Sequence, residues 1–260
     1  MIWSVDSSLT HRTYIVSGGS RGLGLATATA LVARDANVVL LARSSGDLAL
    51  ATSELGSDCC LVLPGDLGDP EVAERAVAAA ASRFGRLDGA LLNTGGPAPS
   101  PASATTDEQW LTAFAAVFIA PLRLARAVAS ALPSSPGEDA ALLFTLSTSV
   151  FRPLRGLAAS NGLRPGLASL VRELAEEWGP SGIRVNGIAP GRIATERVRS
   201  LDARGGDPDE VRSARETHIP LRRYGQPAEF GNVAAFLLSP AASYVTGAVI
   251  PVDGGASFNP

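Results

Sequence analysis

The sequence contains no lysine, because all 22 of its basic residues are arginine. Every mechanism that needs a lysine side chain is therefore excluded. Tyrosine is scarce as well, with Tyr14, Tyr224 and Tyr244 as its three copies. The two cysteines, Cys59 and Cys60, are adjacent and have no third cysteine to pair with, so they indicate core thiols and neither a disulfide nor a metal site.

The chain also lacks a strong charge of one sign and a long apolar run. A net charge of −3 over 260 residues provides no basic field that would favour nucleic acid or an acidic membrane surface. No apolar run is long enough to span a bilayer, and residues 1–12 do not have the basic-then-apolar order of a signal peptide. We therefore expect a cytoplasmic protein with no nucleic-acid or membrane partner.

What the chain does have is a glycine-rich turn between a short apolar strand, 14–16, and an alanine-rich helix, 23–34. Glycine lets the backbone turn tightly there and approach a pyrophosphate closely. The start of the helix offers N–H groups and the positive end of its dipole to an anion. An ordinary strand-to-helix loop would look similar, so the rest of the chain has to decide. The turn is interpreted as a dinucleotide-binding site with contacts from Gly18, Ser20, Arg21, Gly22, Leu23 and Gly24.

The end of the second strand, 37–41, indicates which dinucleotide is bound. Folds of this type often place an acidic residue there against the adenosine ribose, but this chain has Ala42 followed by Arg43. A guanidinium group suits a 2′-phosphate, because it donates two parallel hydrogen bonds to phosphate oxygens. With Arg21 in the glycine turn, two cations and no carboxylate favour NADP(H) over NAD(H). The alternative is that both are solvated surface arginines.

Strand and helix patterns alternate along the chain without a linker. This predicts a single α/β domain, 1–260, with a Rossmann-type doubly wound parallel sheet of about seven strands and helices on both faces. Pro121 is expected to kink the long helix 106–132. The charged segment 196–224 does not look like framework and is predicted to be a mobile helical lid over the substrate. The other strands are expected at 60–64, 90–92, 140–146, 183–188 and 248–252.

With these elements in order, residues 13–256 resemble the short-chain dehydrogenase/reductase family. The segment 17–24 is similar to its cofactor motif T-G-x-x-x-G-x-G, 93–96 to its N-N-A-G turn, and 190–195 to its P-G-x-x-x-T segment, whose threonine grips the nicotinamide carboxamide. The resemblance implies a homotetramer or a homodimer. It also implies further cofactor contacts from Asp66, Leu67, Asn93, Gly95, Pro190, Gly191, Ile193 and Thr195.

The catalytic part departs from the family's pattern. Members of the family use a tyrosine to pass a proton to the carbonyl oxygen, a lysine four residues later, a serine and an asparagine. Aligning 156–164 with the start of the family's catalytic helix puts Leu157 at the tyrosine position and Asn161 at the lysine position. The asparagine position falls at Val117, and the serine position lies somewhere within 147–149. Three of the four catalytic positions are thus replaced.

Arg164 is the candidate to stabilise a developing oxyanion in their place. It lies three residues after Asn161, on a neighbouring helix face, and it stays protonated. Because arginine is a poor proton donor, the proton would come from water, from a hydroxyl such as Ser147 or Thr148, or from His218 on the lid. The alternatives are a surface or interface arginine and a surface histidine with no role. The expected catalytic set is Ser147, Thr148, Asn161 and Arg164.

The expected function is an NADPH-dependent oxidoreductase that acts on a small carbonyl compound or alcohol. Arg152 and Arg155 add positive charge near the expected substrate mouth, which favours an anionic or carrier-bound substrate. Two alternatives stay open: an NADP(H)-binding sensor or partner subunit without redox turnover, and a non-redox enzyme such as a dehydratase or isomerase on the same scaffold. Hydride transfer to a substrate distinguishes the first function from both.

Overall fold

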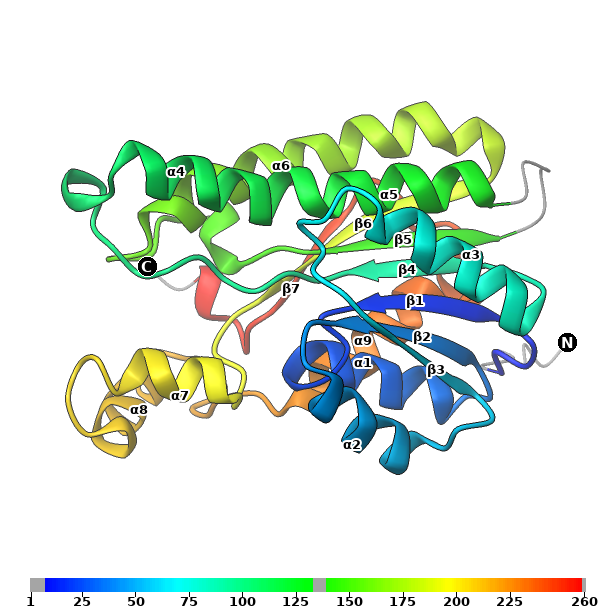
Figure 1. Ribbon diagram of the computed structural model, residues 1–260. Coiled ribbons are helices and arrows are strands. Elements are labelled where there is room, and N and C mark those ends of the chain that lie inside the picture. Colours follow the sequence, from blue (N-terminus) through cyan, green and yellow to red (C-terminus); the bar gives the residue numbers. More distant parts are fainter. Residues whose placement is uncertain (1–7, 133–138, 259–260) are drawn as a thin grey trace, which may run out of the picture.

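The centre of the protein is a parallel sheet. The computed structural model describes residues 8–132 and 139–258, so both ends of the predicted domain 1–260 lie outside the described residues. Within these ranges seven parallel strands lie side by side in the order β3-β2-β1-β4-β5-β6-β7, which confirms the predicted sheet (Figure 1). They are β1 (Thr13–Ser17), β2 (Asn37–Ala42), β3 (Cys60–Pro64), β4 (Gly89–Leu92), β5 (Ala140–Thr145), β6 (Ile183–Pro190) and β7 (Val249–Val252).

Helices cover both faces of the sheet. On one face lie α3 (Val72–Phe84), α5 (Ala120–Ala131) and α6 (Ala158–Trp178), and on the other α1 (Gly22–Val32), α2 (Ser45–Leu55) and α9 (Pro227–Leu238) (Figure 1). A shorter helix, α4 (Asp107–Phe114), leads into α5. The doubly wound arrangement predicted from the alternating pattern is thus confirmed.

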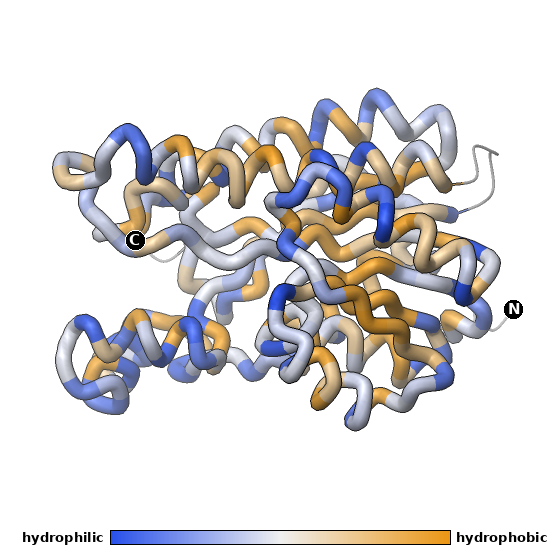
Figure 2. Tube along the Cα trace, viewed as in Figure 1, coloured by the Kyte–Doolittle hydropathy of each residue, from blue (hydrophilic) through white to orange (hydrophobic). Residues whose placement is uncertain are grey.

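The apolar strands divide their side chains between two cores. Ile15 of β1 packs into the core under α3, α5 and α6, whereas Tyr14 and Val16 pack into the core under α1 and α9. A parallel strand covered on both faces is apolar along its whole length, and Figure 2 shows the sheet as a band of apolar colour. Tyr14 is therefore a core residue, whose hydroxyl donates to the carbonyl oxygen of Leu238 at 3.2 Å.

Two helices differ from the expectation. Helix α2 is missing from the sequence prediction; its start is capped by Ser44, whose hydroxyl accepts the N–H of Asp47 at 3.1 Å. The kink expected at Pro121 takes the form of a π-helical turn, Ala115–Ile119, immediately before it. Proline has no N–H and its ring crowds the carbonyl four residues earlier, so a wider turn relieves both problems.

The helix Asp107–Ala131 is also long and apolar enough to cross a membrane, which the sequence analysis does not anticipate. That finding rests on length and composition alone. Half of its most apolar window is buried inside the protein, against the core formed with α3 and α6. Burial of this kind is expected for the core helix of an α/β domain.

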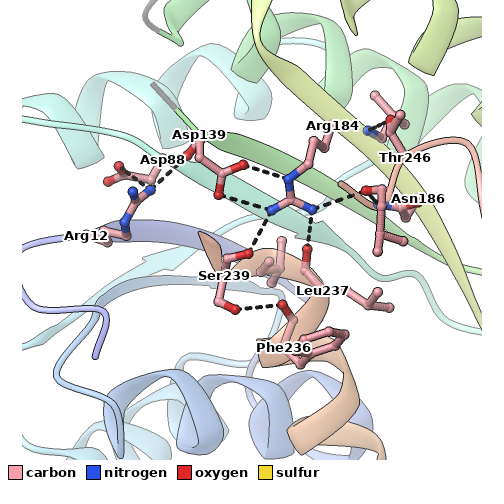
Figure 3. Close-up of polar contacts among 12 residues, drawn as sticks. Arg12, Asp88, Asp139, Arg184, Asn186, Phe236, Leu237, Ser239 and Thr246 are labelled. Atoms are coloured by element: carbon pink, nitrogen blue, oxygen red, sulfur yellow. Dashed lines mark hydrogen bonds and ion pairs between the residues drawn. The ribbon is translucent and has the colours of Figure 1, made fainter. Parts of the chain in front are cut away.

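Near the amino ends of the strands a buried arginine joins several segments. Arg184 of β6 donates to both carboxylate oxygens of Asp139, at 2.6 and 3.2 Å, and to the carbonyl oxygens of Leu237 and Ser239, at 2.8 and 2.9 Å. Figure 3 shows this guanidinium group between the start of β5 and the end of α9. It therefore ties the sheet to α9 at the amino ends of the strands, opposite the predicted cofactor site at their carboxyl ends.

The predicted lid contains two short helices, α7 (Glu196–Asp202) and α8 (Pro208–Glu216), which stand away from the sheet (Figure 1). Asp202 is 1% exposed; it accepts a hydrogen bond from the Tyr224 hydroxyl at 3.0 Å and pairs with Arg192 at 2.8 Å. The two ends of the segment meet where Ala194 donates to the carbonyl of Gly225 at 2.8 Å. The segment is thus an internally braced loop with a closed base, and its mobility stays a prediction.

Candidate functional site

The expected cofactor residues gather at the carboxyl ends of the strands. β1 and β4 are neighbours in the sheet, although the chain passes through β2 and β3 between them. The Ser17 hydroxyl ties their ends together, because it donates to the carbonyl of Asn93 and accepts the N–H of Asn93, both at 2.8 Å. In open α/β sheets ligands bind at such a point, where the strand order reverses.

The glycine turn fits the close approach of a dinucleotide diphosphate. Gly18 and Gly22 have φ angles of 60° and 58°, which side chains rarely adopt. At Gly24 a Cβ atom would lie 2.1 Å from the carbonyl oxygen of Gly18. A Cβ on Gly22 would meet one neighbour, the methyl group of Thr195 at 3.8 Å. The first helical N–H groups of α1 receive no side-chain cap, so this backbone is available to an anion.

The residues expected at the adenosine phosphate lie on the surface beside this turn. Arg43 is exposed just beyond β2, and within the described part of the chain it has no ion pair. Arg21 is 71% exposed and its Nη1 lies 3.4 Å from a carboxylate oxygen of Glu196. Ser20 and Leu23 are half-buried in the turn. Both guanidinium groups are thus placed where a 2′-phosphate has access to them.

The residues after β3 and β4 complete this side of the site. The carboxylate of Asp66 accepts the N–H of Gly68 at 2.8 Å, which fixes its orientation at the end of β3, next to half-buried Leu67. The side-chain amide of Asn93 lies over the glycine turn, because a Cβ on Gly18 would be 2.5 Å from its nitrogen. A Cβ on Gly95 would meet nothing within 4 Å, so the chain there faces open space.

The segment after β6 approaches the same place from the other side. At Gly191, after Pro190, a Cβ would lie 2.6 Å from the Cβ of Asp253, so no side chain fits there. Ile193 is buried and pairs with Gly225, and this anchors the segment. The Thr195 hydroxyl accepts the N–H of Val198 at 3.3 Å and begins α7. Its methyl group faces Gly22, so the two halves of the expected cofactor site do meet in space.

Ser160 and Arg164 of α6 are the residues that face the end of β5. The Ser160 hydroxyl lies 3.1 Å from the hydroxyl of Ser149, and both are buried. Nη1 of Arg164 donates to the carbonyl oxygens of Thr145 and Leu146, at 2.6 and 2.9 Å. The two residues are four apart, which is the spacing of the family's tyrosine and lysine. Ser160 and Arg164 thus have the same spacing as Leu157 and Asn161, three residues further along the chain.

The residues expected at these positions have other contacts. Leu157 precedes α6 and pairs with Ser100 through the backbone. The side-chain amide of Asn161 accepts the N–H of Leu154 at 2.9 Å and donates to its carbonyl oxygen at 2.8 Å. Both polar atoms of Asn161 are thus used to hold the loop before α6. Asn161 therefore positions this loop, and its catalytic role stays a prediction.

The hydroxyl groups that follow β5 have different contacts. The Ser147 hydroxyl accepts the N–H of Ser149 at 3.1 Å and so begins a 3₁₀ turn, while Thr148 is buried in that turn. Ser149, which is outside the expected set, is the one whose hydroxyl reaches Ser160. Nearby, the hydroxyl of Thr145 is buried without a hydrogen-bond partner in the described ranges. Polar atoms therefore converge at the carboxyl end of β5.

Burial makes Arg164 unusual among the arginines. Its side chain is 5% exposed, and desolvation, followed by the nearby charge of Arg197, lowers its pKa to about 10. Within residues 8–132 and 139–258 it has no carboxylate partner. An arginine with this pKa is still charged at neutral pH, so it can stabilise negative charge that develops beside it.

The remaining candidates lie on other segments of the chain. Val117 is buried in the π-helical turn, where it offers no polar atom. Nδ1 of His218 lies 3.0 Å from the Thr217 hydroxyl and 3.1 Å from the Ala214 carbonyl oxygen, at the end of α8. Arg152 and Arg155 are exposed in the loop before α6. The contacts of His218 with Thr217 and Ala214 hold its ring at the end of α8.

Comparison with known proteins finds relatives over nearly the whole chain. Residues 18–257 match a family model described as enoyl-(acyl carrier protein) reductase. The chain is 34% identical to levodione reductase of Leifsonia aquatica over 98% of its own length and 97% of that protein. It is 33% identical to an uncharacterized oxidoreductase of Mycobacterium tuberculosis over 96% of its length and 94% of that protein.

A solved structure with the same fold is the NADPH-bound short chain oxidoreductase of Pseudomonas aeruginosa PAO1, described as containing an atypical catalytic center. The two share a TM-score of 0.87 and 31% identity, over 95% of this chain and 97% of that one. The matched length, the strand order and the glycine turn lead to one assignment: the chain belongs to the short-chain dehydrogenase/reductase family.

Proposed function

We propose that the protein is an NADPH-dependent oxidoreductase that reduces a carbonyl group with an arginine in place of the family's tyrosine and lysine. The observation that carries this proposal is the buried Arg164, which lies at the end of β5 four residues after Ser160. When bound, the nicotinamide cofactor supplies a hydride to the carbonyl carbon, and the carbonyl oxygen takes up a proton. The glycine turn, Asn93 and Thr195 would hold this cofactor.

The chain's own contribution is electrostatic. Arg164 is fixed by two backbone carbonyl groups and stabilises the charge that grows on the carbonyl oxygen. Preorganised donors act strongly where water is excluded, because they need not reorient during the reaction. Ser149 and Ser160 offer hydroxyl groups that orient the same oxygen. The proton comes from water or from one of these hydroxyls, since arginine is a poor proton donor.

A protein that binds NADP(H) without turnover is the second candidate, because the family's tyrosine and lysine are both missing. NADPH oxidation with a panel of ketones, aldehydes and acyl thioesters separates the two. Turnover supports the oxidoreductase, whereas tight binding of NADPH with no oxidation across the panel contradicts it. We also infer a cytoplasmic homotetramer or homodimer, which sedimentation of the purified protein would test.

The preference for NADPH is expected to depend on Arg43. In Arg43→Ala, NADPH should bind about 10- to 100-fold more weakly, because one charge-assisted contact with the 2′-phosphate is lost. NADH, which lacks that phosphate, should bind almost as before. Titration of each cofactor by nicotinamide fluorescence measures both constants. An equal loss for the two cofactors would show that Arg43 does not contact the 2′-phosphate.

The pH dependence of turnover should follow the charge on Arg164. Because burial lowers its pKa to about 10, the cation is present at neutral pH and is lost as the pH rises through that value. We therefore expect kcat to be level from about pH 7 to about pH 9 and to fall above it. In Arg164→Lys the fall should begin at lower pH, since desolvation lowers the pKa of lysine further. A fall at the same pH in both proteins would mean that another group titrates.

A further inference from the structure

The arginines between the end of β6 and the end of α8 fall into two groups. Six arginines lie between residues 190 and 216, and four of them face a carboxylate: Arg192 and Arg215 pair with Asp202, Arg199 with Asp209, and Arg212 with Glu216. The other two, Arg197 and Arg204, have no carboxylate partner in the described ranges. Arg197 lies in the first turn of α7, and Arg204 lies two residues beyond the end of that helix.

Arg197 reaches from the lid across to the loop after β4. Its Nη2 donates to the carbonyl oxygen of Pro97 at 2.7 Å. Its guanidinium group covers Gly96, where a Cβ would lie 3.1 Å from Nη2 and 3.4 Å from Nε. Arg197 therefore stands at the open side of the site, between the lid and the turn that begins with Asn93.

Arg197 is coupled electrostatically to two other arginines. Partial burial and the charge of Arg204 lower the pKa of Arg197, and Arg197 in turn lowers the pKa of Arg164. No carboxylate offsets any of these three cations in the described part of the chain. Like charges that are gathered and partly desolvated destabilise one another, and an anion bound between them removes that cost.

We propose that the substrate is an anionic carbonyl compound whose carboxylate or phosphate group binds Arg197 while its carbonyl oxygen lies at Arg164. This assignment rests on the proposed reductase function for the position of the carbonyl. Arg197 has the planar fork that binds such oxyanions through two hydrogen bonds. Arg204 adds charge that attracts the anion, and the absence of a side chain at Gly96 lets the guanidinium group of Arg197 lie against the backbone there.

Equilibrium binding to the NADPH-loaded protein tests the site without requiring turnover. The probes are matched pairs: pyruvate and methyl pyruvate, acetoacetate and methyl acetoacetate, dihydroxyacetone phosphate and dihydroxyacetone. In at least one pair the anion should bind about 10- to 100-fold more tightly than its neutral partner, and Arg197→Gln should remove that difference. A preference in the pyruvate or acetoacetate pair would indicate a carboxylate substrate, and a preference in the dihydroxyacetone pair would indicate a phosphate ester.

Arg199→Gln is the matched control, because Arg199 lies on the same helix but pairs with Asp209. It should keep the preference for the anion. Equal binding within every pair in the unmodified protein, or an equal loss in both variants, would overturn the assignment. So would a loss of NADPH affinity in Arg197→Gln with the anion preference intact, since Arg197 would then hold the cofactor. Turnover of neutral ketones without anion preference overturns this inference alone, and anion binding without any turnover overturns the reductase function alone.

Discussion

Replacing Arg164 by methionine should lower kcat by about 10²- to 10³-fold, which is the usual cost of removing one oxyanion-stabilising donor. Methionine keeps most of the side-chain volume, so the space between α6 and β5 stays filled. NADPH affinity should change little, because the glycine turn, Asn93 and Thr195 are untouched. Turnover under saturating NADPH, together with nicotinamide fluorescence for binding, measures both quantities.

The stability of this variant should change less than its activity. Among the described residues Arg164 has no carboxylate partner, and the desolvation of its buried charge opposes folding. Loss of the bonds to Thr145 and Leu146 is thus partly offset by removal of a buried charge. Arg164→Lys should keep part of the activity, since the cation remains but its fork is lost.

Arg172→Met on the exposed side of α6 is the matched control, and its turnover should equal that of the unmodified protein. An Arg164→Met protein that is folded, binds NADPH and turns over normally would show that Arg164 only ties α6 to β5. In that case the oxyanion would have to be stabilised by other groups.

The sequence predicts the scaffold well because its signals are local. The apolar strands and the glycine turn each depend on a short run of residues, and the structure has a strand at each of the predicted positions. Helix α2 is the exception, since it buries few side chains, namely Leu48 and Ala51, and has a weak apolar pattern. Its best signal is Ser44, which caps the N–H of Asp47.

The catalytic register is harder to predict, because it depends on the length of a loop. The segment between Ser149 and α6 has no regular pattern, and Leu157 stands at a position similar to a family helix start. The sequence also offers a second register: Arg164, the first arginine within α6, has a hydroxyl residue, Ser160, four positions before it. The contacts that fix Arg164 come from β5, 18 and 19 residues away in the sequence, where no local pattern reveals them.

Arg184→Met should have the opposite effect to Arg164→Met: a large loss of stability with little change in kcat per folded molecule. Arg184 and Asp139 form a buried pair, and removing one partner of such a pair costs about 3–5 kcal/mol because the other charge is left uncompensated. The carbonyl oxygens of Leu237 and Ser239 lose a donor as well. At about 2–4 °C per kcal/mol for a domain of this size, the Tm should fall by about 6–20 °C.

Urea unfolding and thermal melting of Arg184→Met measure this loss, with Arg199→Met as the control. Arg199 forms an exposed pair with Asp209, so its replacement should leave the Tm almost unchanged. Because Arg184 lies near the amino ends of the strands and the cofactor site lies at their carboxyl ends, kcat at a temperature where Arg184→Met is folded should stay near normal. A loss of kcat under those conditions would mean that the contacts of Arg184 at the amino ends of the strands affect the cofactor site at their carboxyl ends. A normal Tm would show that the Asp139 pair contributes no net stability, as when desolvation cancels the attraction between the charges.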